Sequence, residues 1–186
     1  MFQPKAIALP GRHVDLEPLS ERHLPDLFEL GTEPSIWRFL SGAPFLKIQD
    51  AEAWLRKALD GQASAGDVPF AVIDKKSGKV AGTTRYVDVR RVHRGIEIGS
   101  TWYGQPFRRT PVSTEAKFLL LGHTFEQLDA LRVQFQTDSR NARSQQAIER
   151  LGASREGVLR QHRLCSDGYV RDSVIYGITA LEWPVV

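Results

Sequence analysis

The segment WYGQPFRRTPVSTEAKFLLLGHTF, residues 102–125, has the pattern of a strand end, a short loop and a long helix. Thr110 is a favourable N-cap, and Pro111 suits the first helical position because its φ is fixed and its missing N–H would have no partner there. A helix N-terminus offers unpaired N–H groups and a partial positive charge, which together bind phosphates. Arg108 and Arg109 add charge-assisted donors. The segment therefore predicts either a phosphate site or a capped core helix with solvated arginines.

Phosphate loops at such junctions usually contain glycines, but the stretch QPFRRTPVS contains none. A phosphate needs free N–H groups, and glycine only makes the close approach of the backbone easier. If this loop binds a phosphate, the expected backbone donors are the N–H groups of Arg109, Thr110, Val112 and Ser113.

The histidines do not indicate a metal site, because none of them has a ligand spacing such as H-E-x-x-H. They are His13, His23, His93, His123 and His162. His123 falls in the middle of the long helix, where the pattern favours a satisfied core residue over a ligand. We therefore expect no bound metal.

The periodicity of the apolar residues predicts the elements that must position this loop. Strands are expected in GRHVDLEPLS, on both sides of the turn KKSGK, in HRGIEIGSTWYG, in LRVQFQTD and in a final hairpin whose loop contains Asp167 and Gly168. Helices are expected in ERHLPDLFELG, QDAEAWLRKALDG, the segment after Thr110 and SRNARSQQAIERLGA. This order predicts an α/β fold with a mixed, mostly antiparallel sheet of six or seven strands and helices on both faces. A ligand is expected at the centre of the sheet, beyond the C-terminal ends of strands.

Length and composition are typical of one globular domain over residues 1–186, with its core at about 10–180. Hydrophobic residues make up 41% of the chain and charged residues 25%. There is one cysteine, Cys165, no signal-peptide pattern and no long apolar run, so we expect a cytoplasmic protein that does not cross a membrane. The net charge of +3 is spread over scattered basic residues without a recognition motif, so specific nucleic-acid binding is not expected.

Four stretches resemble the GCN5-related N-acetyltransferase (GNAT) superfamily, and within it the ribosomal-protein-alanine N-acetyltransferase branch, RimJ/RimL-like. They are IEIGSTWY, STEAKFLLLGHTFEQL, RVQFQTDSRNARSQQAIERLGASREGVLR and SDGYVRDSVIYGI. The resemblance implies acetyl-coenzyme A (acetyl-CoA) as the acetyl donor and a primary amine as the acceptor. It also implies that two central strands splay apart around the pantetheine arm, while the pyrophosphate lies at the start of the central helix.

The resemblance also implies roles for individual residues. Glu97, flanked by two isoleucines, would be the general base that takes a proton from the acceptor, because apolar surroundings raise a carboxyl pKa toward the useful range. A backbone N–H near Ser100, Thr101 and Trp102 would polarise the thioester carbonyl. Asn141 would bind the pantetheine arm or simply cap its helix.

The sequence departs from the superfamily at two places. The usual glycines of the pyrophosphate loop are missing, and the tyrosine that many relatives have seven residues after the helix asparagine is replaced by Ile148. Ser144, three residues after Asn141, matches the serine of the RimJ/RimL-like branch. Ser144 would donate a proton to the leaving thiolate or only bind the coenzyme, and the sequence leaves both open.

The acceptor side is the least specific part of the sequence. The resemblance places Trp37 and Phe39 at the acceptor site, although core packing is the competing explanation for such aromatics. A protein N-terminus and a small-molecule amine are both compatible with the chain. The rival functions are a coenzyme-binding module with weak catalysis and a protein that binds a ribosomal or RNA surface. The apolar ending, with Trp183, suggests a homodimer contact.

Overall fold

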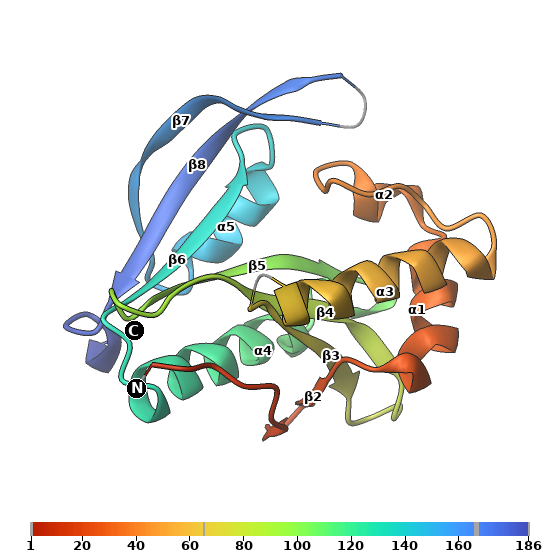
Figure 1. Cartoon of the computed structure of the whole chain (residues 1–186), viewed down its shortest axis with the longest axis horizontal. Helices are drawn as coiled ribbons and strands as arrows, with labels where there is room; N and C mark the ends of the chain where they lie inside the picture. The colour runs from red at the N-terminus through yellow and green to blue at the C-terminus, as the bar shows by residue number, and fades with distance from the viewer. Residues whose placement is uncertain (1, 65, 166–167, 186) are drawn as a thin grey trace.

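An eight-stranded mixed sheet forms the framework of the protein (Figure 1). The computed structural model describes residues 2–64, 66–165 and 168–185, and the strands follow the order β1-β2-β3-β4-β5-β6-β8-β7. Within these residues, neighbouring strands are antiparallel except for the parallel pair β5 and β6. The strands are β1 Leu9–Pro10, β2 Val14–Pro18, β3 Val68–Asp74, β4 Val80–Arg90, β5 Gly95–Tyr103, β6 Arg132–Asp138, β7 Ser154–Leu164 and β8 Val170–Thr179.

Helices cover both faces of this sheet, as the sequence predicts. One face packs against α4 and α5, and the other packs against α1, α2 and α3. The α-helices are α1 Leu24–Gly31, α2 Pro34–Trp37, α3 Ile48–Ser64, α4 Pro111–Gly122 and α5 Ala142–Glu149. The short helical turns are η1 Glu21–His23, η2 Gln105–Phe107, the π-helical turn η3 His123–Gln127 and η4 Trp183–Val185.

The sheet has one strand more than the six or seven that we expected. The additional strand is β1, whose two residues pair with Leu16 and Asp15 of β2. Two residues are too few for an alternating pattern, so the sequence gives no signal for this strand. In the final hairpin, Asp167 lies outside the described residues, and Gly168 follows it with a φ of +81°.

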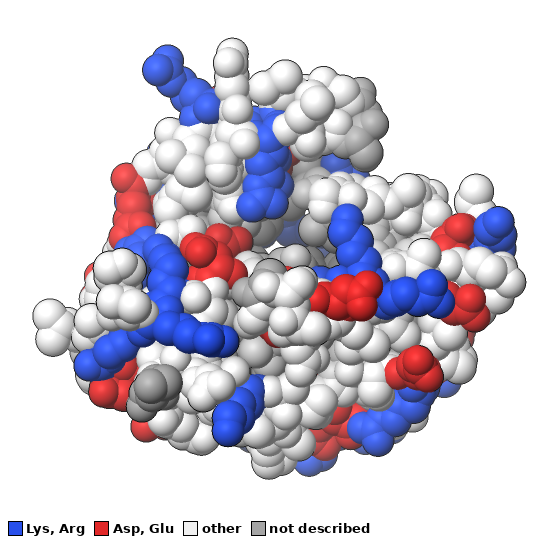
Figure 2. Space-filling model, viewed as in Figure 1, with Lys and Arg blue, Asp and Glu red and all other residues white. Residues whose placement is uncertain are grey.

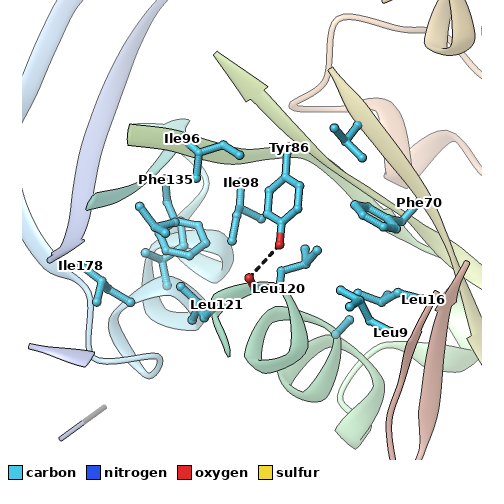
Figure 3. Packing of buried hydrophobic residues seen from close by; sticks show 14 of the residues in the cluster. Leu9, Leu16, Phe70, Tyr86, Ile96, Ile98, Leu120, Leu121, Phe135 and Ile178 are labelled. Atoms are coloured by element: carbon cyan, nitrogen blue, oxygen red, sulfur yellow. Dashed lines mark hydrogen bonds between the residues drawn. The ribbon is translucent and has the colours of Figure 1, made fainter. Parts of the chain in front are cut away.

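The larger core lies between the sheet and α4, and Figure 3 shows its centre. Tyr86 of β4 is fully buried there and donates a hydrogen bond to the carbonyl oxygen of Leu120 at 2.8 Å (Figure 3). Ile96 and Ile98 of β5 point into the same core, so the residue between them faces the other side of the sheet. This packing fixes the orientation of β5, on which the candidate base lies.

Strands β5 and β6 separate soon after they begin. They pair only where residues 95–97 lie opposite residues 132–134. Beyond Glu97, β5 continues to Tyr103 along β4, whereas β6 continues to Asp138 along β8. The edge of β5 that faced β6 is therefore unpaired after Glu97. The predicted splay of the central strands is confirmed.

The hairpin of β7 and β8 extends away from the rest of the sheet and arches toward the side on which α2 lies (Figure 1). The side chains of β7 are exposed along the whole strand. Within the residues that the structure describes, no helix is both long enough and apolar enough to cross a membrane.

Candidate active site

A cleft of about 1120 Å³ opens where β5 and β6 separate. Its walls come from four places: the segment around α2, the diverging strands, the start of α4 with the first turns of α5, and the hairpin β7–β8. Figure 2 shows a hollow between the hairpin and the rest of the molecule, with Lys and Arg side chains reaching toward it. The cleft therefore joins the predicted phosphate loop to the splayed strands.

Glu97 is the last residue of β5 that pairs with β6, and it is buried, with 8% of its surface exposed. It lines the cleft and accepts a hydrogen bond from the Gln134 side chain at 3.1 Å. Burial raises the pKa of the Glu97 carboxyl, and the Gln134 hydrogen bond and the charge of Arg163 offset part of that rise. A Cβ at Gly99 would lie 3.0 Å from Glu97 Oε1, so the glycine leaves room for this carboxylate. A carboxyl with a raised pKa at the branch point can accept a proton near neutral pH.

Lys117 of α4 approaches the same gap from the opposite face of the sheet. Its Nζ donates hydrogen bonds to Thr101 Oγ1 of β5 at 2.5 Å and to Thr84 Oγ1 at 3.0 Å. The Nζ also lies 6.0 Å from the ring centroid of Phe135 on β6, so the ammonium spans the two separating strands. Burial lowers the pKa of Lys117 to about 7, while the charge of Glu97 acts in the opposite direction. An amine with such a pKa can exchange a proton near neutral pH.

Lys117 is a cleft residue that the sequence reasoning missed. It follows the polar first turns of α4 and lies among apolar residues, so the signal for it was a charged residue on a face that the helix buries. Two of the apolar residues on either side of it, Ala116 and Leu120, are fully buried. A lysine at such a position needs either a counter-charge or a function.

A β-bulge sits between Glu97 and the end of β5. Arg85 of β4 lies opposite Gly99 and Thr83 lies opposite Trp102, so β5 has one residue more than β4 in this interval. Ser100 has a φ of +48° within the bulge. The extra residue turns the Thr101 side chain toward α4, where Lys117 binds it. Ser100, Thr101 and Trp102 all line the cleft, as the resemblance implied.

The start of α4 forms the other end of the cleft. Thr110 caps the helix by accepting a hydrogen bond from the Val112 N–H at 3.3 Å, and Pro111 is the first helical residue, as predicted. This bond uses one of the expected phosphate donors, and the Val112 side chain is buried in the core. Among the described residues, the N–H groups of Arg109 and Thr110 have no hydrogen-bond partner. Ser113 lines the cleft in the first turn of α4.

The arginines of the loop differ in their surroundings. Arg109 is exposed with a φ of +60°, whereas Arg108 is anchored by hydrogen bonds from Nε to the Tyr103 carbonyl and from Nη1 to Ser35 Oγ. Burial and the nearby charge of Arg143 both lower the pKa of Arg108. Arg108 precedes α4 and Arg143 lies in the first turn of α5, and two guanidinium groups that repel each other form a suitable place for an anion.

Asn141 and Ser144 lie together at the start of α5, and both line the cleft. The Asn141 Oδ1 accepts a hydrogen bond from the Ser144 N–H at 3.1 Å and so caps the helix. The capping interpretation of Asn141 is thus present in the structure. The Ser144 hydroxyl has no hydrogen-bond partner among the described residues, which leaves it open to a ligand.

The two aromatic residues expected at the acceptor site have different positions. Phe39 lines the cleft. Trp37 does not, because its ring packs on Phe45 and Trp102 in the smaller core and its Nε1 donates to the Gly31 carbonyl at 2.8 Å. The structure thus shows the core packing that was the competing explanation for Trp37, and a role of this residue at the acceptor site stays a prediction.

Three residues that line the cleft have a buried polar atom without a hydrogen-bond partner among the described residues. The atoms are Gln136 Oε1, Trp102 Nε1 and Tyr103 Oη. Such groups are costly to leave unpaired, so a ligand with amide groups, such as pantetheine, fits this section of the cleft. Among the described residues, no cluster of His, Cys, Asp and Glu could hold a metal ion.

Trp183 is covered by its own chain. Its ring stacks on Phe125 with centroids 5.4 Å apart and lies 5.6 Å from the Phe118 ring, and its Nε1 donates to Glu126 at 2.9 Å. Contacts within the chain thus cover part of Trp183, while Val185 and Leu181 beside it are exposed, and a homodimer contact at this end stays a prediction.

Comparisons with known proteins agree with this architecture. The family model described as Acetyltransferase (GNAT) domain matches residues 13–154. A crystal structure of a GCN5-related N-acetyltransferase from Brucella melitensis is 34% identical, with 98% of this chain and 82% of that chain covered and a TM-score of 0.92. A probable acetyltransferase of the GNAT family from Chromobacterium violaceum ATCC 12472 is 33% identical, with 98% and 90% covered and a TM-score of 0.89.

A more distant structure shares the fold. It is RimL, a ribosomal L7/L12 alpha-N-protein acetyltransferase, which is 16% identical, with 93% of this chain and 94% of that chain covered and a TM-score of 0.81. No curated protein matches the chain.

Proposed function

The chain belongs to the GNAT acetyltransferase family, and from that premise we propose that it transfers acetyl from acetyl-CoA directly to a primary amine. The observation that supports this proposal is the cleft itself, which places a buried carboxylate at the branch point of β5 and β6 and a helix N-terminus with arginines at its other end. No covalent enzyme intermediate is required, because a thioester is already activated.

Glu97 is the general base in this proposal. An acceptor amine is an ammonium at neutral pH and must lose a proton before its nitrogen can attack. The carboxylate takes that proton directly or through water. Its raised pKa, caused mainly by burial, makes it a stronger base than an exposed glutamate.

The unpaired edge of β5 polarises the thioester carbonyl. After Glu97, the backbone N–H groups on this edge have lost β6 as a partner, and the bulge at Ser100 displaces the chain near the gap. An N–H from residues 100–102 is positioned to donate to the carbonyl oxygen, where negative charge develops during attack.

Lys117 is the proton donor to the leaving sulfur in this proposal. The new C–N bond forms as the C–S bond breaks, and the thiolate then takes a proton from the Lys117 ammonium. The attacking nitrogen loses a second proton, which restores the lysine, and the proton held by Glu97 is released to solvent. Lys117 is better suited to this task than Ser144, because an amine with a pKa of about 7 gives up a proton far more readily than a hydroxyl. Ser144 is then a ligand of the coenzyme.

The start of α4 holds the pyrophosphate. Arg109 and Thr110 contribute backbone N–H groups, Ser113 adds the first helical turn, and Arg108 and Arg109 supply positive charge. Asn141 caps α5 through its oxygen and has its amide nitrogen available for the pantetheine arm.

A transfer assay tests this function. Radiolabelled acetyl-CoA is incubated with amino acids, peptides with free N-termini, polyamines and aminoglycosides, and labelled products are separated and counted. We expect at least one amine to be acetylated, and a peptide N-terminus is the acceptor that the RimJ/RimL-like resemblance favours. Calorimetric binding of coenzyme A without turnover of any acceptor would instead support a coenzyme-binding module. Steeply salt-dependent RNA binding that ignores acetyl-CoA would support the RNA-surface function.

A further inference from the structure

Two arginines of the hairpin β7–β8 face each other across the strands. Arg163 of β7 and Arg171 of β8 are direct register partners, and both line the cleft. Like charges at directly opposite positions of an antiparallel pair destabilise it. The repulsion is visible in Arg171, whose pKa is lowered by burial and further lowered by the charge of Arg163.

Neither arginine is neutralised by an ion pair within the described residues. Arg171 is half-buried, and its Nε donates to Ser173 Oγ at 3.0 Å. The charge of Asp138 acts on Arg171. The Asp138 carboxylate, however, already binds Arg140 through both of its oxygens, at 3.1 and 2.9 Å. Arg171 is half-buried and Arg163 is exposed, and two like charges side by side without an ion pair among the described residues are expected to attract an anion.

This position differs from the one expected for the phosphates of the coenzyme. The charges of Arg163 and Arg171 both act on Glu97, which places them at the end of the cleft where transfer occurs. A second pair of guanidinium groups consists of Arg108, which precedes α4, and Arg143 in the first turn of α5, and the charge of one acts on the other. The cleft therefore has two cationic pairs, and Arg163 and Arg171 are the pair whose charges act on Glu97.

We propose that Arg163 and Arg171 bind a carboxylate of the acceptor, so that the preferred acceptor is an amine with an acidic group close to the reacting nitrogen. This inference rests on the proposed acetyl transfer. A guanidinium pair binds a planar carboxylate through parallel N–H donors, and this contact orients the amine toward Glu97. The carboxylate belongs either to a free amino acid or to an acidic residue near the N-terminus of a peptide.

Matched acceptors test the proposal and distinguish the two sources. One arm compares the peptide Ser-Asp-Ala amide with Ser-Asn-Ala amide, which differ in one negative charge. The other arm compares free glutamate and aspartate with glutamine amide and asparagine amide. The acceptor class that supplies the carboxylate, either peptides or free amino acids, should show a preference for its anionic member. We expect kcat/KM for that anionic acceptor to exceed kcat/KM for its neutral partner by about tenfold, the usual contribution of one charge-assisted hydrogen bond.

Arginine variants locate the effect. In Arg163→Gln and Arg171→Gln, the preference for the anionic acceptor should fall to about twofold or less, while KM for acetyl-CoA stays within about twofold. Arg171→Lys keeps the charge and should retain part of the preference. Arg160→Gln is the matched control, because it removes the same charge from the same exposed strand at a position that does not line the cleft.

Binding without turnover gives a second readout. Calorimetry of the wild type with coenzyme A and the acceptor, which cannot react, should show tighter binding of the anionic acceptor and loss of this difference in Arg171→Gln.

Equal kcat/KM for charged and neutral acceptors in both arms would overturn the inference and leave the acetyltransferase function intact. Absence of transfer to every amine would contradict the proposed function itself. An unchanged preference in both glutamine variants would show that the carboxylate binds elsewhere.

Discussion

At the start of α4, the cleft offers backbone N–H groups and arginines that remain largely in contact with water. At the branch point of β5 and β6, it offers Glu97 and Lys117, two ionisable groups whose pKa values are moved toward neutrality by burial. The first end presents charge that changes little with pH, as binding a phosphate requires. The second end presents a carboxyl with a raised pKa and an amine with a pKa of about 7, which suit acid–base chemistry. In the proposed function, binding and proton transfer are thus separated by the depth at which the fold places charged side chains.

Replacement of the proposed base, Glu97, should lower kcat more than any other substitution at either end of the cleft. In Glu97→Gln, kcat at neutral pH should fall by about a hundredfold or more, because the acceptor ammonium loses its proton acceptor. The dissociation constant of coenzyme A, measured by calorimetry, should stay within about twofold. Turnover that is unaffected by this substitution would show that Glu97 is not the base.

Replacement of the buried lysine should lower kcat by about tenfold to a hundredfold. The wild type needs a charged Lys117, so its kcat should decline as pH rises above about 7. Lys117→Met should lack that decline, because the titrating group is gone. Lys117→Arg is the matched control, since it keeps the charge but cannot release a proton near neutral pH. A pH profile of kcat that Lys117→Met leaves unchanged would argue against proton donation.

Stability gives an independent view of the same lysine. Below pH 7 the Lys117 ammonium is charged in the folded and unfolded chain alike, so the full cost of burying it is present. Between about pH 7 and 10.5 the folded protein holds a neutral amine while the unfolded chain remains charged, so the wild type gains stability as the pH rises through this range. Lys117→Met should therefore raise the free energy of unfolding at pH 6 by about 2 kcal/mol, with less gain at pH 10. The hydroxyl groups of Thr84 and Thr101, which Lys117 binds, also form a hydrogen bond with each other at 2.8 Å, so the substitution leaves neither hydroxyl without a partner. A loss of stability in denaturant titration at pH 6 would instead assign Lys117 a structural role.

Charge reversal in the phosphate loop should affect binding but not chemistry. Arg109→Glu is expected to weaken coenzyme A binding by about tenfold, because it places a negative charge beside the pyrophosphate. Arg91→Glu is the control at an exposed position that does not line the cleft, and it should change the dissociation constant by less than about twofold. Equal effects of the two variants in calorimetry would show that the loop is not the phosphate site.

The smallest effect is expected at the proline of the same loop. Pro111→Ala supplies the N–H that proline lacks at the first helical position, so coenzyme A should bind about twofold to threefold more tightly. The kcat should stay unchanged, because the chemistry takes place at the other end. Weaker binding in Pro111→Ala would show that the fixed φ of proline matters more than the missing donor.

The start of α4, the proposed phosphate end, was largely predictable from the sequence as a helix start, because its determinants are local. Thr110 and Pro111 start a helix through their own backbone preferences, and the structure has both in the expected positions. The use of the Val112 N–H by the Thr110 cap could not be foreseen, since the choice of partner depends on side-chain rotamers. Asn141 was likewise predictable as a cap from its place before the helix of Ala142–Glu149.

The other end depended on contacts between distant segments. Glu97 was found through its two isoleucine neighbours, but Lys117 was not, because its partners Thr84 and Thr101 come from two other strands. The sequence left the position of Trp37 open for the same reason. Its ring packs with Phe45 and Trp102, and nothing in the local pattern distinguishes a core aromatic from one that faces a cleft.

By itself, the sequence determined the mixed sheet, the helix that starts at Pro111, the family resemblance and Glu97 as the candidate base, because periodicity, caps and motifs act over a few residues. That residues 1–186 form one domain stays a prediction. The tertiary structure alone decided the points that depend on long-range pairing. The bulge at Ser100 turns Thr101 toward Lys117, the separation of β5 and β6 brings that ammonium toward Glu97, and the register of the hairpin sets Arg163 opposite Arg171. Each of these depends on which strand lies beside which, and no short stretch of sequence encodes that choice.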